Sequence, residues 1–353
     1  MSPRRGEAAR LTYAEAGVDI AAGDKAVERI KDHVRSTFRP GVLGDLGGFG
    51  GLFDVGRLGY EDPLLVSTTD GVGTKSVIAQ QVGRYDTIGI DCVAMSVDDL
   101  AAHGADPLFF LDYVSVGRLD ADQIDDLVGG VAHGCRDAGC ALLGGEMSEH
   151  PGVLEPGAFD LVGFAVGAVE RARLLPAGVT PGDRVLGLAS PGLRCNGYSL
   201  AREAFTRAGR SLDGPAWRGA RHTLGAELLR PSVIYAPALR DLRRRVAVHA
   251  LAHVTGGGLA ANLARVLPER CDAVLLRGAW DVPRIFSVVQ AAGDIADEEM
   301  EHVFNLGLGM LAVVAPDDVH RALDVLRATG HPAWPVGAIE AGHGRVRFAD
   351  AAG

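Results

Sequence analysis

The sequence predicts a two-domain protein of the mixed α/β (α+β) class. Stretches with the composition of strands alternate with amphipathic helical stretches along most of the 353 residues, a pattern typical of sheets covered by helices. Residues 171–182 hold two prolines and two glycines between two such alternating halves, as interdomain linkers do. We therefore expect an N-terminal segment over residues 1–60, an N-terminal domain over 61–170 and a C-terminal domain over 183–353.

The N-terminal segment is expected to contain one helix and one glycine-rich loop. Apolar residues recur with helical spacing over residues 21–34, and Asp24 is placed to cap this helix. The run 44–51 (GDLGGFGG) is either a plain linker or a flap that closes over a ligand. Phe49 is an unusual residue for a mere spacer, which favours the flap.

The other elements follow from composition and periodicity. In the first half we expect strands at 106–117, 140–143 and 159–169 and a helix at 122–138. In the second half we expect strands at 184–189, 248–253, 309–315 and near Val336 and Val346, with helices at 199–208, 232–246, 259–266 and 317–329. The basic run 240–245 is most simply the solvated end of a helix.

A glycine-rich turn at residues 67–75 (STTDGVGTK) follows a short apolar run that is typical of a strand. Gly71 and Gly73 carry no Cβ, so the backbone there can approach an oxygen-rich ligand closely. Asp70 offers an anionic oxygen of the kind that Mg²⁺ prefers, and Lys75 offers a charge for a phosphate. The run matches neither GxxxxGK[ST] nor GxGxxG, and an ordinary turn would produce it equally well.

Residues 87–104 carry three carboxylates and are expected to form a short strand or turn that leads into a helix. On a helix, Asp98 lies seven residues after Asp91 and returns to the same face, whereas Asp99 is rotated by roughly 100°. One of Asp98 and Asp99 is therefore expected to be a metal ligand, and the other a cap or a solvated charge. Acidic side chains on an apolar helix are costly to bury unless paired or metal-bound, which favours a polyphosphate–Mg²⁺ site.

Three further polar or glycine-rich segments are candidates for ligand contacts. Gly144 and Gly145 precede Glu146 at a strand end, where backbone and carboxylate could meet a ligand, although a turn or cap explains them too. Glycines 256–258 lead into a helix and offer bare N–H groups for a phosphate, as does the loop at 192–199. Asn305 is either a satisfied core amide or a contact to substrate.

Composition limits the classes of function. The net charge is −10, which argues against a nucleic-acid partner because no basic stripe is present. Five cysteines without a CxxC pair argue against a disulfide framework or zinc site and fit buried thiols in a reducing cytosol. The sequence has no apolar stretch of the roughly 18 residues that a membrane span needs and no apolar signal-peptide core. We expect a cytoplasmic enzyme.

The segments at 67–75 and 87–104 resemble the nucleotide-binding signature of the phosphoribosylformylglycinamidine cyclo-ligase (AIR synthetase) family of purine biosynthesis. Other matching stretches occur in the family's order, at 13–19 (YAEAGVD), 46–51 (LGGFGG), 107–113 (PLFFLDY), 144–146 (GGE), 196–200 (NGYSL), 253–258 (HVTGGG) and 304–310 (FNLGLGM). The resemblance covers essentially the whole chain.

The resemblance implies the ATP-dependent cyclisation of formylglycinamidine ribonucleotide to aminoimidazole ribonucleotide, with release of ADP and phosphate. It implies ATP and Mg²⁺ as cofactors, a C-terminal α/β sandwich, and a homodimer in which the N-terminal domains join their sheets into a barrel. Two alternatives stay open: a paralogue of the same ATP-dependent superfamily that activates another amide or amidine, and a non-catalytic nucleotide-binding subunit.

Site residues follow from the motifs and the resemblance together. The expected catalytic residues are Lys31, Asp99 and Arg194, and the expected metal ligands are Asp70, Asp99 and Glu146. The expected nucleotide-binding residues are Gly48, Gly50, Asp70, Gly71, Gly73, Lys75 and Asp91. The expected substrate-binding residues are Asn196, Gly197, Thr255, Gly256, Gly257 and Asn305. The role of Lys31 comes from the resemblance alone, since most helical lysines are surface residues.

Three positions depart from the family's usual pattern. Arg194 stands where His is usual, Asp98 where Asn is usual, and Met147-Ser148 where Thr-Ala is more familiar. Arginine cannot shuttle a proton near neutral pH, although it can clamp an anion. These changes indicate either a tolerant variant or a paralogue with another substrate.

Overall fold

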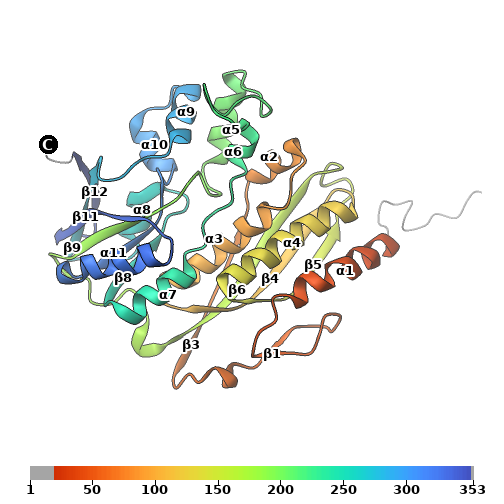
Figure 1. Cartoon of the computed structure of the whole chain (residues 1–353), viewed down its shortest axis with the longest axis horizontal. Helices are drawn as coiled ribbons and strands as arrows, with labels where there is room; N and C mark the ends of the chain where they lie inside the picture. Colours follow the sequence, from red (N-terminus) through yellow and green to blue (C-terminus); the bar gives the residue numbers. More distant parts are fainter. Residues whose placement is uncertain (1–19, 351–353) are drawn as a thin grey trace, which may run out of the picture.

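The structure is a computed structural model that describes residues 20–350. It contains two units side by side, each a sheet covered by helices (Figure 1). This arrangement confirms the predicted two-domain α/β class. Predictions that fall on residues 1–19, including the matching stretch at 13–19, lie outside the described residues.

The N-terminal sheet has four strands. Their order is β3 (Pro63–Gly71), β6 (Phe159–Glu170), β4 (Asp106–Val116) and β5 (Ala141–Glu149). Strands β4 and β5 run parallel and are connected by α4 (Ala121–Ala138), because parallel neighbours need a crossover. The other two strand pairs are antiparallel. Strand β5 extends well past residue 143, where the predicted strand ends.

The register places functional candidates in one row across this sheet. Asp70 of β3 pairs with Gly163 of β6, Gly163 pairs with Asp112 of β4, and Asp112 pairs with Gly145 of β5. Strands β3 and β5 form the two edges, so the ends of this row are three strand spacings apart.

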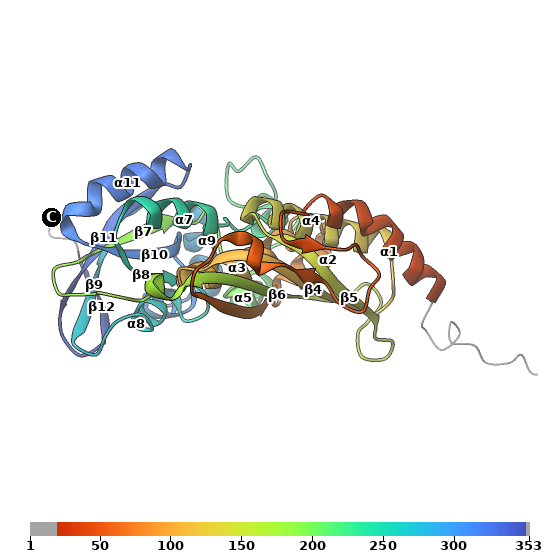
Figure 2. The same cartoon turned by 90° about the horizontal axis from the view of Figure 1, so that it is seen from below.

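Helices cover one face of the N-terminal sheet. Helices α1 (Ile20–Arg35) and α4 lie together on the same side of it (Figure 2), and α3 (Ile88–Ala102) packs on β3 and β6. Asp120 caps α4 by accepting hydrogen bonds from two N–H groups of its first turn. Helix α1 already begins at Ile20, so the prediction that Asp24 caps it is wrong.

The other face of this sheet exposes large apolar side chains. Leu65 is 64% exposed, Phe164 40% and Tyr113 38%. Isolated exposed apolar residues are ordinary, but three on one face of adjoining strands mark a surface suited to a partner.

Short elements complete the N-terminal unit. Strands β1 (Val42–Leu43) and β2 (Leu52–Phe53) form a small hairpin, and the glycine-rich loop 44–51 joins them. A 3-10 helix, η1 (Val55–Leu58), leads to β3, and α2 (Lys75–Val82) follows β3. The loop is thus held at both ends.

The C-terminal sheet has six strands in the order β12-β9-β11-β7-β10-β8. Their bounds are β7 (Arg184–Ala189), β8 (Val248–His253), β9 (Cys271–Arg277), β10 (Leu308–Val314), β11 (Ala333–Ala341) and β12 (Val346–Asp350). The predicted strands at 184–189 and 248–253 are confirmed, whereas β9 was not predicted. Strands β12 and β9 run parallel, and the other neighbours are antiparallel.

Helices surround this second sheet. They are α5 (Tyr198–Arg207), α6 (Leu224–Leu228), α7 (Ala236–Arg245), α8 (Gly258–Ala264), α9 (Arg284–Gly293), α10 (Asp297–Val303) and α11 (Val319–Ala328), with the 3-10 helices η2 (Arg171–Arg173) and η3 (Pro316–Asp318). Helices α6, α9 and α10 were not predicted. Helix α7 begins four residues later than the predicted start at 232, because residues 232–235 are an irregular segment that contacts α3.

One apolar core runs through both units. Val97 of α3, Leu186 of β7 and Leu239 of α7 are fully buried members of the same cluster, while a second cluster with Leu259 of α8 fills the other face of the C-terminal sheet. Arg243 also joins the units, since it donates to the carbonyl of Gly104 and, at 2.8 Å, to Asp106. The prediction that the basic run 240–245 is simply a solvated helix end is therefore wrong for Arg243.

The cysteines are all free and buried, which confirms the expectation of unpaired thiols. Within residues 20–350, no helix combines the length and apolarity needed to span a bilayer.

Candidate functional site

The acidic face of α3 points toward the C-terminal unit. Asp91 and Asp98 are both fully buried, seven residues apart as the helical spacing requires. Asp91 Oδ1 accepts hydrogen bonds from the backbone N–H of Ser232 at 2.8 Å and from its hydroxyl at 2.5 Å. Asp98 Oδ1 accepts from the N–H groups of Tyr235 at 2.8 Å and Ala236 at 3.0 Å. Asp98 therefore caps α7 from another helix.

Lys75 and Asp91 form a buried ion pair. Lys75 Nζ lies 2.6 Å from Asp91 Oδ2, with both side chains fully buried, and it donates to the carbonyl of Arg230 at 2.9 Å. The sequence predicts that Lys75 faces a phosphate and that Asp91 contacts the nucleotide. The Lys75 ammonium would have to leave Asp91 before it could reach a phosphate. Both residues belong to the N-terminal unit, and the pair contacts the C-terminal unit through Arg230 and Ser232.

Arg194 is the centre of the interdomain contact. Its Nη2 lies 3.0 Å from Asp98 Oδ2, its Nη1 donates to the carbonyl of Val233 at 2.8 Å, and the guanidinium stacks on Tyr235 at 5.0 Å from the ring centroid. Burial raises the pKa of Asp98 in spite of the guanidinium charge. Arg194 has φ +63°, a left-handed conformation that is uncommon for a non-glycine residue. Such strain persists where surrounding contacts hold it.

Arg194 also determines which ring nitrogen of His253 carries the proton. Its Nη2 lies 2.9 Å from His253 Nε2, and His253 Nδ1 lies 2.8 Å from Asp99 Oδ1. Because arginine only donates, Nε2 must accept and Nδ1 must carry the proton that is donated to Asp99. The structure thus builds a chain of hydrogen bonds from Asp98 through Arg194 and His253 to Asp99.

Asp70 and Asp99 share one environment. Thr68 Oγ1 lies 3.4 Å from Asp99 Oδ2, and Asp70 projects from the same face of β3 because it is two residues further on. Burial raises the pKa of Asp70, and the negative charge of Asp99 adds to that rise. Burial opposes ionisation of Asp99 too, but the hydrogen bond that His253 donates, with the charge of Arg265 and the hydroxyl of Thr68, holds the pKa of Asp99 below its usual value. Two carboxylates whose charges repel each other form a site that a cation would stabilise.

The glycine-rich turn after β3 lies beside this carboxylate pair. Gly73 has φ +56°, while Gly71 ends the strand in extended conformation. The chain at Gly73 passes near the carbonyl of Cys195 in the 192–199 loop, and Thr74 Oγ1 lies 3.1 Å from Ser199 Oγ. The predicted nucleotide loop and the predicted phosphate loop are therefore brought together.

Two more of the predicted substrate loops meet. The Asn196 Nδ2 atom would lie 3.8 Å from a Cβ on Gly256, and Asn196 Oδ1 is buried without a hydrogen-bond partner among the described residues. Gly197 and Gly257 take φ +80° and +93°, which glycine permits. An unpaired buried amide oxygen is a cost that a ligand donor would remove.

Asn262 holds the triple-glycine turn in place. Its Nδ2 donates to the carbonyl of Gly258 at 2.8 Å and to that of Gly256 at 3.2 Å, and its Oδ1 lies 3.3 Å from Thr255 Oγ1. Asn305 has a similar internal role, since it donates to Gly192 at 3.0 Å and accepts from Gly307 at 2.8 Å. Of the two predictions for Asn305, the satisfied core amide agrees with these contacts.

A separate cavity of about 750 Å³ lies at the other edge of the N-terminal sheet. The loop 44–51, with Gly48 and Gly50, forms one wall, and Glu146 of β5 lies on another. Lys31 of α1 is near this cavity: after the hydrogen bond from Arg35, its charge contributes to holding the pKa of Asp45 below the usual value. Lys31 itself pairs with Glu28.

The predicted site residues therefore fall into two groups in one chain. Asp70 lies on edge strand β3 and Glu146 on edge strand β5, and three strand spacings amount to about 14 Å. No group of three metal-ligating acids, histidines or cysteines is present in the described part of the chain. Of the three expected metal ligands, Asp70 and Asp99 therefore lie together, whereas Glu146 of the same chain lies at the other edge of the sheet.

Sequence reasoning missed His253, Asn262 and Asp112. His253 stands in the stretch 253–258, which drew attention for its glycines alone, and a histidine directly before such a turn was the available signal. Asn262 and Asp112 carried no signal, because their importance depends on partners far away in sequence.

Comparison with known proteins gives two family matches. Residues 54–169 match the N-terminal domain of AIR synthase related proteins, and residues 180–349 match the C-terminal domain of the same proteins. A phosphoribosylformylglycinamidine cyclo-ligase of Anaeromyxobacter sp. (strain Fw109-5) is 53% identical over 95% of this chain and 98% of its own. The enzyme of that name from Carboxydothermus hydrogenoformans is 47% identical over 95% and 98%.

Solved structures share the fold at low identity. A thiamine-monophosphate kinase from Stenotrophomonas maltophilia superposes with a TM-score of 0.69 at 20% identity, covering 91% of this chain and 95% of its own. The hydrogenase maturation protein HypE in complex with ATP gives a TM-score of 0.63 at 18% identity, covering 92% and 91%. These likenesses establish the architecture and nothing about substrate.

Proposed function

The chain belongs to the phosphoribosylformylglycinamidine cyclo-ligase family, and from this premise we propose how its residues carry out the family's reaction. The enzyme is an ATP-dependent carbon–nitrogen ligase that converts formylglycinamidine ribonucleotide to aminoimidazole ribonucleotide. ATP, when bound, supplies the phosphoryl group that turns the amide oxygen into a leaving group, and the amidine nitrogen then closes the ring. The protein must therefore position phosphate and amide together and neutralise the charge that develops.

The interdomain site supplies these functions. The turn at 70–75 and the loops at 192–199 and 255–258 converge there with bare backbone N–H groups and the unpaired amide oxygen of Asn196. Backbone donors of this kind hold phosphate oxygens without a side-chain charge. In this proposal Asn196, Gly197, Thr255, Gly256 and Gly257 contact substrate.

Asp70 and Asp99 would hold Mg²⁺. The ion is usually bound by one or two carboxylates together with phosphate oxygens and water, and not by a full protein cage. Two carboxylates with mutually repelling charges fit that requirement, and the lack of a third ligand within the described residues is consistent with it. When bound, the ion would supply positive charge that offsets the charge of the phosphate oxygens.

Arg194 and His253 would orient Asp99. With the hydrogen bonds seen in the structure, neither would serve as a general acid or base. His253 donates its Nδ1 proton to Asp99 and accepts at Nε2 from Arg194, so neither ring nitrogen is free. His253 holds Oδ1 of Asp99, and Oδ2, which has only the 3.4 Å contact with Thr68 Oγ1 besides, would be the oxygen that meets a cation. Arg194 is accordingly a positioning residue for Asp99.

The observation that carries the proposal is the convergence of Asp70, Asp99 and the two glycine-rich loops at one domain boundary. The test is ADP release by the purified chain with Mg²⁺, ATP and formylglycinamidine ribonucleotide. Substrate-dependent release that Asp99→Asn lowers by about 100-fold or more is expected, since such charge stabilisation contributes several kcal/mol. ATP binding without turnover would instead indicate a paralogue or a silent subunit.

The proposed assembly is a homodimer through the exposed face of the N-terminal sheet. Support comes from the exposed Leu65, Phe164 and Tyr113 and from the edge strands β3 and β5, each of which has a single strand neighbour within residues 20–350. Joining β3 of one chain to β5 of another would protect both edges, and would bring the Glu146 cavity of one chain next to the Asp70 site of the other. A cytoplasmic location is proposed because five free buried thiols suit a reducing compartment.

A further inference from the structure

Carboxylates of the protein engage both of the cations that the sequence predicts for the interdomain site. Lys75 Nζ lies 2.6 Å from Asp91 Oδ2, with both side chains buried. Arg194 Nη2 lies 3.0 Å from Asp98 Oδ2, again with both side chains buried. Phosphoryl transfer depends mainly on positioning and on positive charge around the transferred group. That charge therefore has to come from a bound metal ion or from another side chain.

Arg265 supplies a positive charge beside this site. It directly follows α8 and is exposed. Within residues 20–350 it forms no ion pair with a carboxylate. Its guanidinium is therefore available to an anion that binds at the domain boundary.

The geometry of α8 directs Arg265 toward the triple-glycine turn. Side chains on a helix lean toward its N-terminus, so a long side chain at the end of a short helix reaches back over the preceding turn. Arg265 Nη1 donates to Asn262 Oδ1 at 3.4 Å. The same oxygen accepts from Thr255 Oγ1 at 3.3 Å. The guanidinium and the Thr255 hydroxyl thus meet on one buried amide beside glycines 256–258.

Arg265 is also close to Asp99, which belongs to the other unit. Burial opposes ionisation of Asp99, but the hydrogen bond that His253 donates and the charge of Arg265 help to hold the pKa of Asp99 below its usual value. The ion pair of Asp99 is with His253 and not with Arg265. The guanidinium therefore faces the domain boundary without being tied to the carboxylate there.

We propose that Arg265 is a further catalytic residue, whose guanidinium donates to phosphoryl oxygens between the triple-glycine turn and Asp99. This inference rests on the proposed function, since it adds a residue to the same site. A guanidinium offers two parallel N–H donors, which match two oxygens of one phosphoryl group. These oxygens can belong to the group transferred from ATP or to the ribose phosphate of the substrate.

The two sources differ in what the contact does. During transfer, the bond from the γ-phosphorus to ADP breaks as the bond to the amide oxygen forms, and ADP takes the electron pair. The phosphoryl oxygens keep their negative charge throughout, and an arginine beside them stays protonated. A contact to this group raises kcat, whereas a contact to the unreacting ribose phosphate serves binding. The proximity of Arg265 to Asp99 favours the transferred group.

The kinetic experiment measures ADP release by the full chain and by Arg265→Gln and Arg265→Lys. Arg265→Gln is expected to lower kcat by about 100-fold or more with little change in KM for the substrate. If the ribose phosphate is the ligand instead, KM for the substrate rises by about tenfold or more at unchanged kcat. Arg265→Lys should recover only part of either loss, because lysine brings the charge without the planar fork.

Chemical rescue separates a phosphoryl contact from a structural role. Free guanidinium, kept below the concentration that unfolds the chain, should restore part of the activity of Arg265→Ala. An arginine that merely favoured the C-terminal end of α8 would not be replaced in this way.

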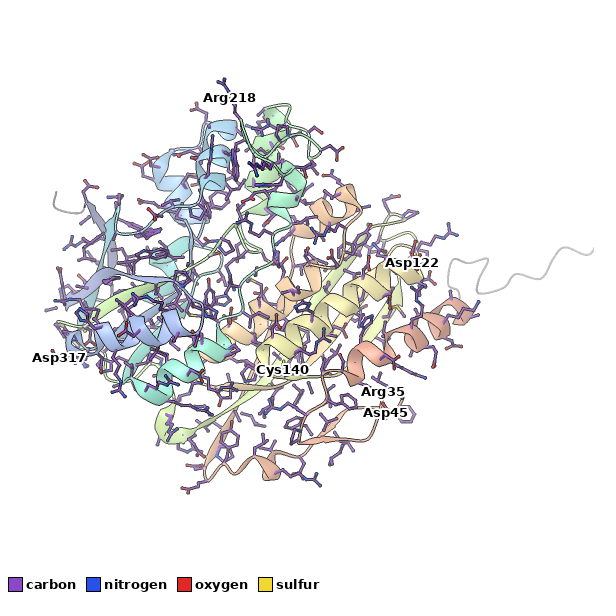
Figure 3. All side chains as sticks on the ribbon, viewed as in Figure 1. Arg35, Asp45, Asp122, Cys140, Arg218 and Asp317 are labelled. Carbon is purple, nitrogen blue, oxygen red and sulfur yellow. The ribbon has the colours of Figure 1, made fainter. Side chains whose placement is uncertain are left out.

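Arg321→Gln is the matched control. Arg321 is an exposed arginine of α11, and α11 covers the opposite face of the C-terminal sheet from α8. Asp317, which precedes α11, lies at the outer edge of the C-terminal unit in Figure 3. Arg321→Gln should therefore match the wild type in kcat and in KM.

A binding experiment tests the contact without turnover. Isothermal titration calorimetry in the presence of Mg²⁺ compares ATP with ADP, and aminoimidazole ribonucleotide with its riboside. For the transferred group, Arg265→Gln should reduce the preference for ATP over ADP by about tenfold, since a hydrogen bond to a charged group is lost. For the ribose phosphate, it should reduce the preference for the ribonucleotide over the riboside by a similar factor.

The outcomes separate this inference from the proposed function. If the wild type releases no ADP in response to substrate, the proposed function is wrong, and the two binding preferences still decide the role of Arg265. A wild type that binds neither pair of ligands would contradict both proposals. If the wild type turns over and Arg265→Gln keeps its kcat, KM and both preferences, only the present inference is overturned. It is also overturned if activity falls together with stability in urea and guanidinium restores none of it.

Discussion

At the scale of single residues, the two departures from the family pattern in the interdomain site explain each other. According to the resemblance, Arg194 and Asp98 stand where His and Asn are expected, and the structure places them 3.0 Å apart with both side chains buried. An arginine alone would bring an uncompensated buried charge, as would the aspartate. Together they neutralise one another, so the two departures can be understood as one coupled change.

A double-mutant cycle tests this coupling. Arg194→His and Asp98→Asn should each destabilise the chain, by about 3–5 kcal/mol for a broken buried pair, and each should lower kcat/KM. The double variant should recover most of both losses, since a neutral pair leaves no buried charge. Urea denaturation and ADP-release kinetics measure the two effects. Strictly additive losses would show that the residues act independently.

A change in the free energy of unfolding with pH is also expected from a single residue, Asp112. Burial raises the pKa of Asp112 to about 7 in the folded chain, well above the usual value of an aspartate, so the folded state binds the proton more tightly than the unfolded state does. Stability relative to Asp112→Asn should therefore fall as pH rises from about 4 to about 7, by at most about 4 kcal/mol, and stay level above that. Denaturation midpoints of both proteins across this range measure the difference. A difference that does not change with pH would contradict the prediction.

At the scale of elements, α3 connects the two units. Asp91 and Asp98 bind the segment before α7, and Asp99 binds His253 of β8. All three carboxylates therefore contact the C-terminal unit, Asp91 and Asp98 through the segment before α7 and Asp99 through β8. Helical spacing explains this division, because Asp99 is rotated by roughly 100° from Asp98.

The buried Lys75–Asp91 pair allows a test of whether Lys75 stabilises the fold or binds a phosphate. Lys75→Met leaves Asp91 buried without a cation and should cost about 3–5 kcal/mol of stability, whereas Lys75→Met with Asp91→Leu should restore much of it. Chemical denaturation of the single and double variants measures this, with ATP affinity followed in parallel. If Lys75→Met keeps full stability but loses ATP binding, the lysine contacts phosphate as the sequence predicts.

At the scale of the whole molecule, the two predicted clusters of site residues lie at opposite edges of one sheet. Asp70 and Asp99 lie near β3, while Glu146 and the loop 44–51 lie near β5. A single chain leaves about 14 Å between these edges. An isologous dimer that joins the edges would bring the clusters together twice, by symmetry.

Complementation between variants tests this assembly. Asp99→Asn and Glu146→Gln should each be nearly inactive alone. An equal mixture, refolded or co-expressed, should recover about a quarter of wild-type activity, because half of the dimers are mixed and each has one intact composite site. Activity is measured by ADP release and assembly by sedimentation. No recovery in a mixture that forms mixed dimers would confine the site to one chain.

Much of the fold could be predicted because it depends on local patterns. Strands β7 and β8 and the boundaries of α4 follow from runs of apolar residues and from Asp120 and Gly139 at the helix ends. Helices α9 and α10 and strand β9 were missed. Helices α9 and α10 pack on α5 and α8, so the surfaces that they bury are formed by segments far away in the sequence. The site was predicted less completely, because motif glycines mark a turn without naming its partners.

The sequence by itself determined the family and the two alternating halves. It also determined the helical spacing that places Asp91 and Asp98 on one face of α3 and Asp99 on another. Tertiary structure alone decided that Lys75 is buried on Asp91, that Arg194 joins Asp98 to His253, that Glu146 is remote from Asp70, and that Asp112 lines a cavity. The physical reason is that periodicity along the chain fixes the direction of a side chain, whereas its charge state and partners depend on groups contributed by residues tens or hundreds of positions away.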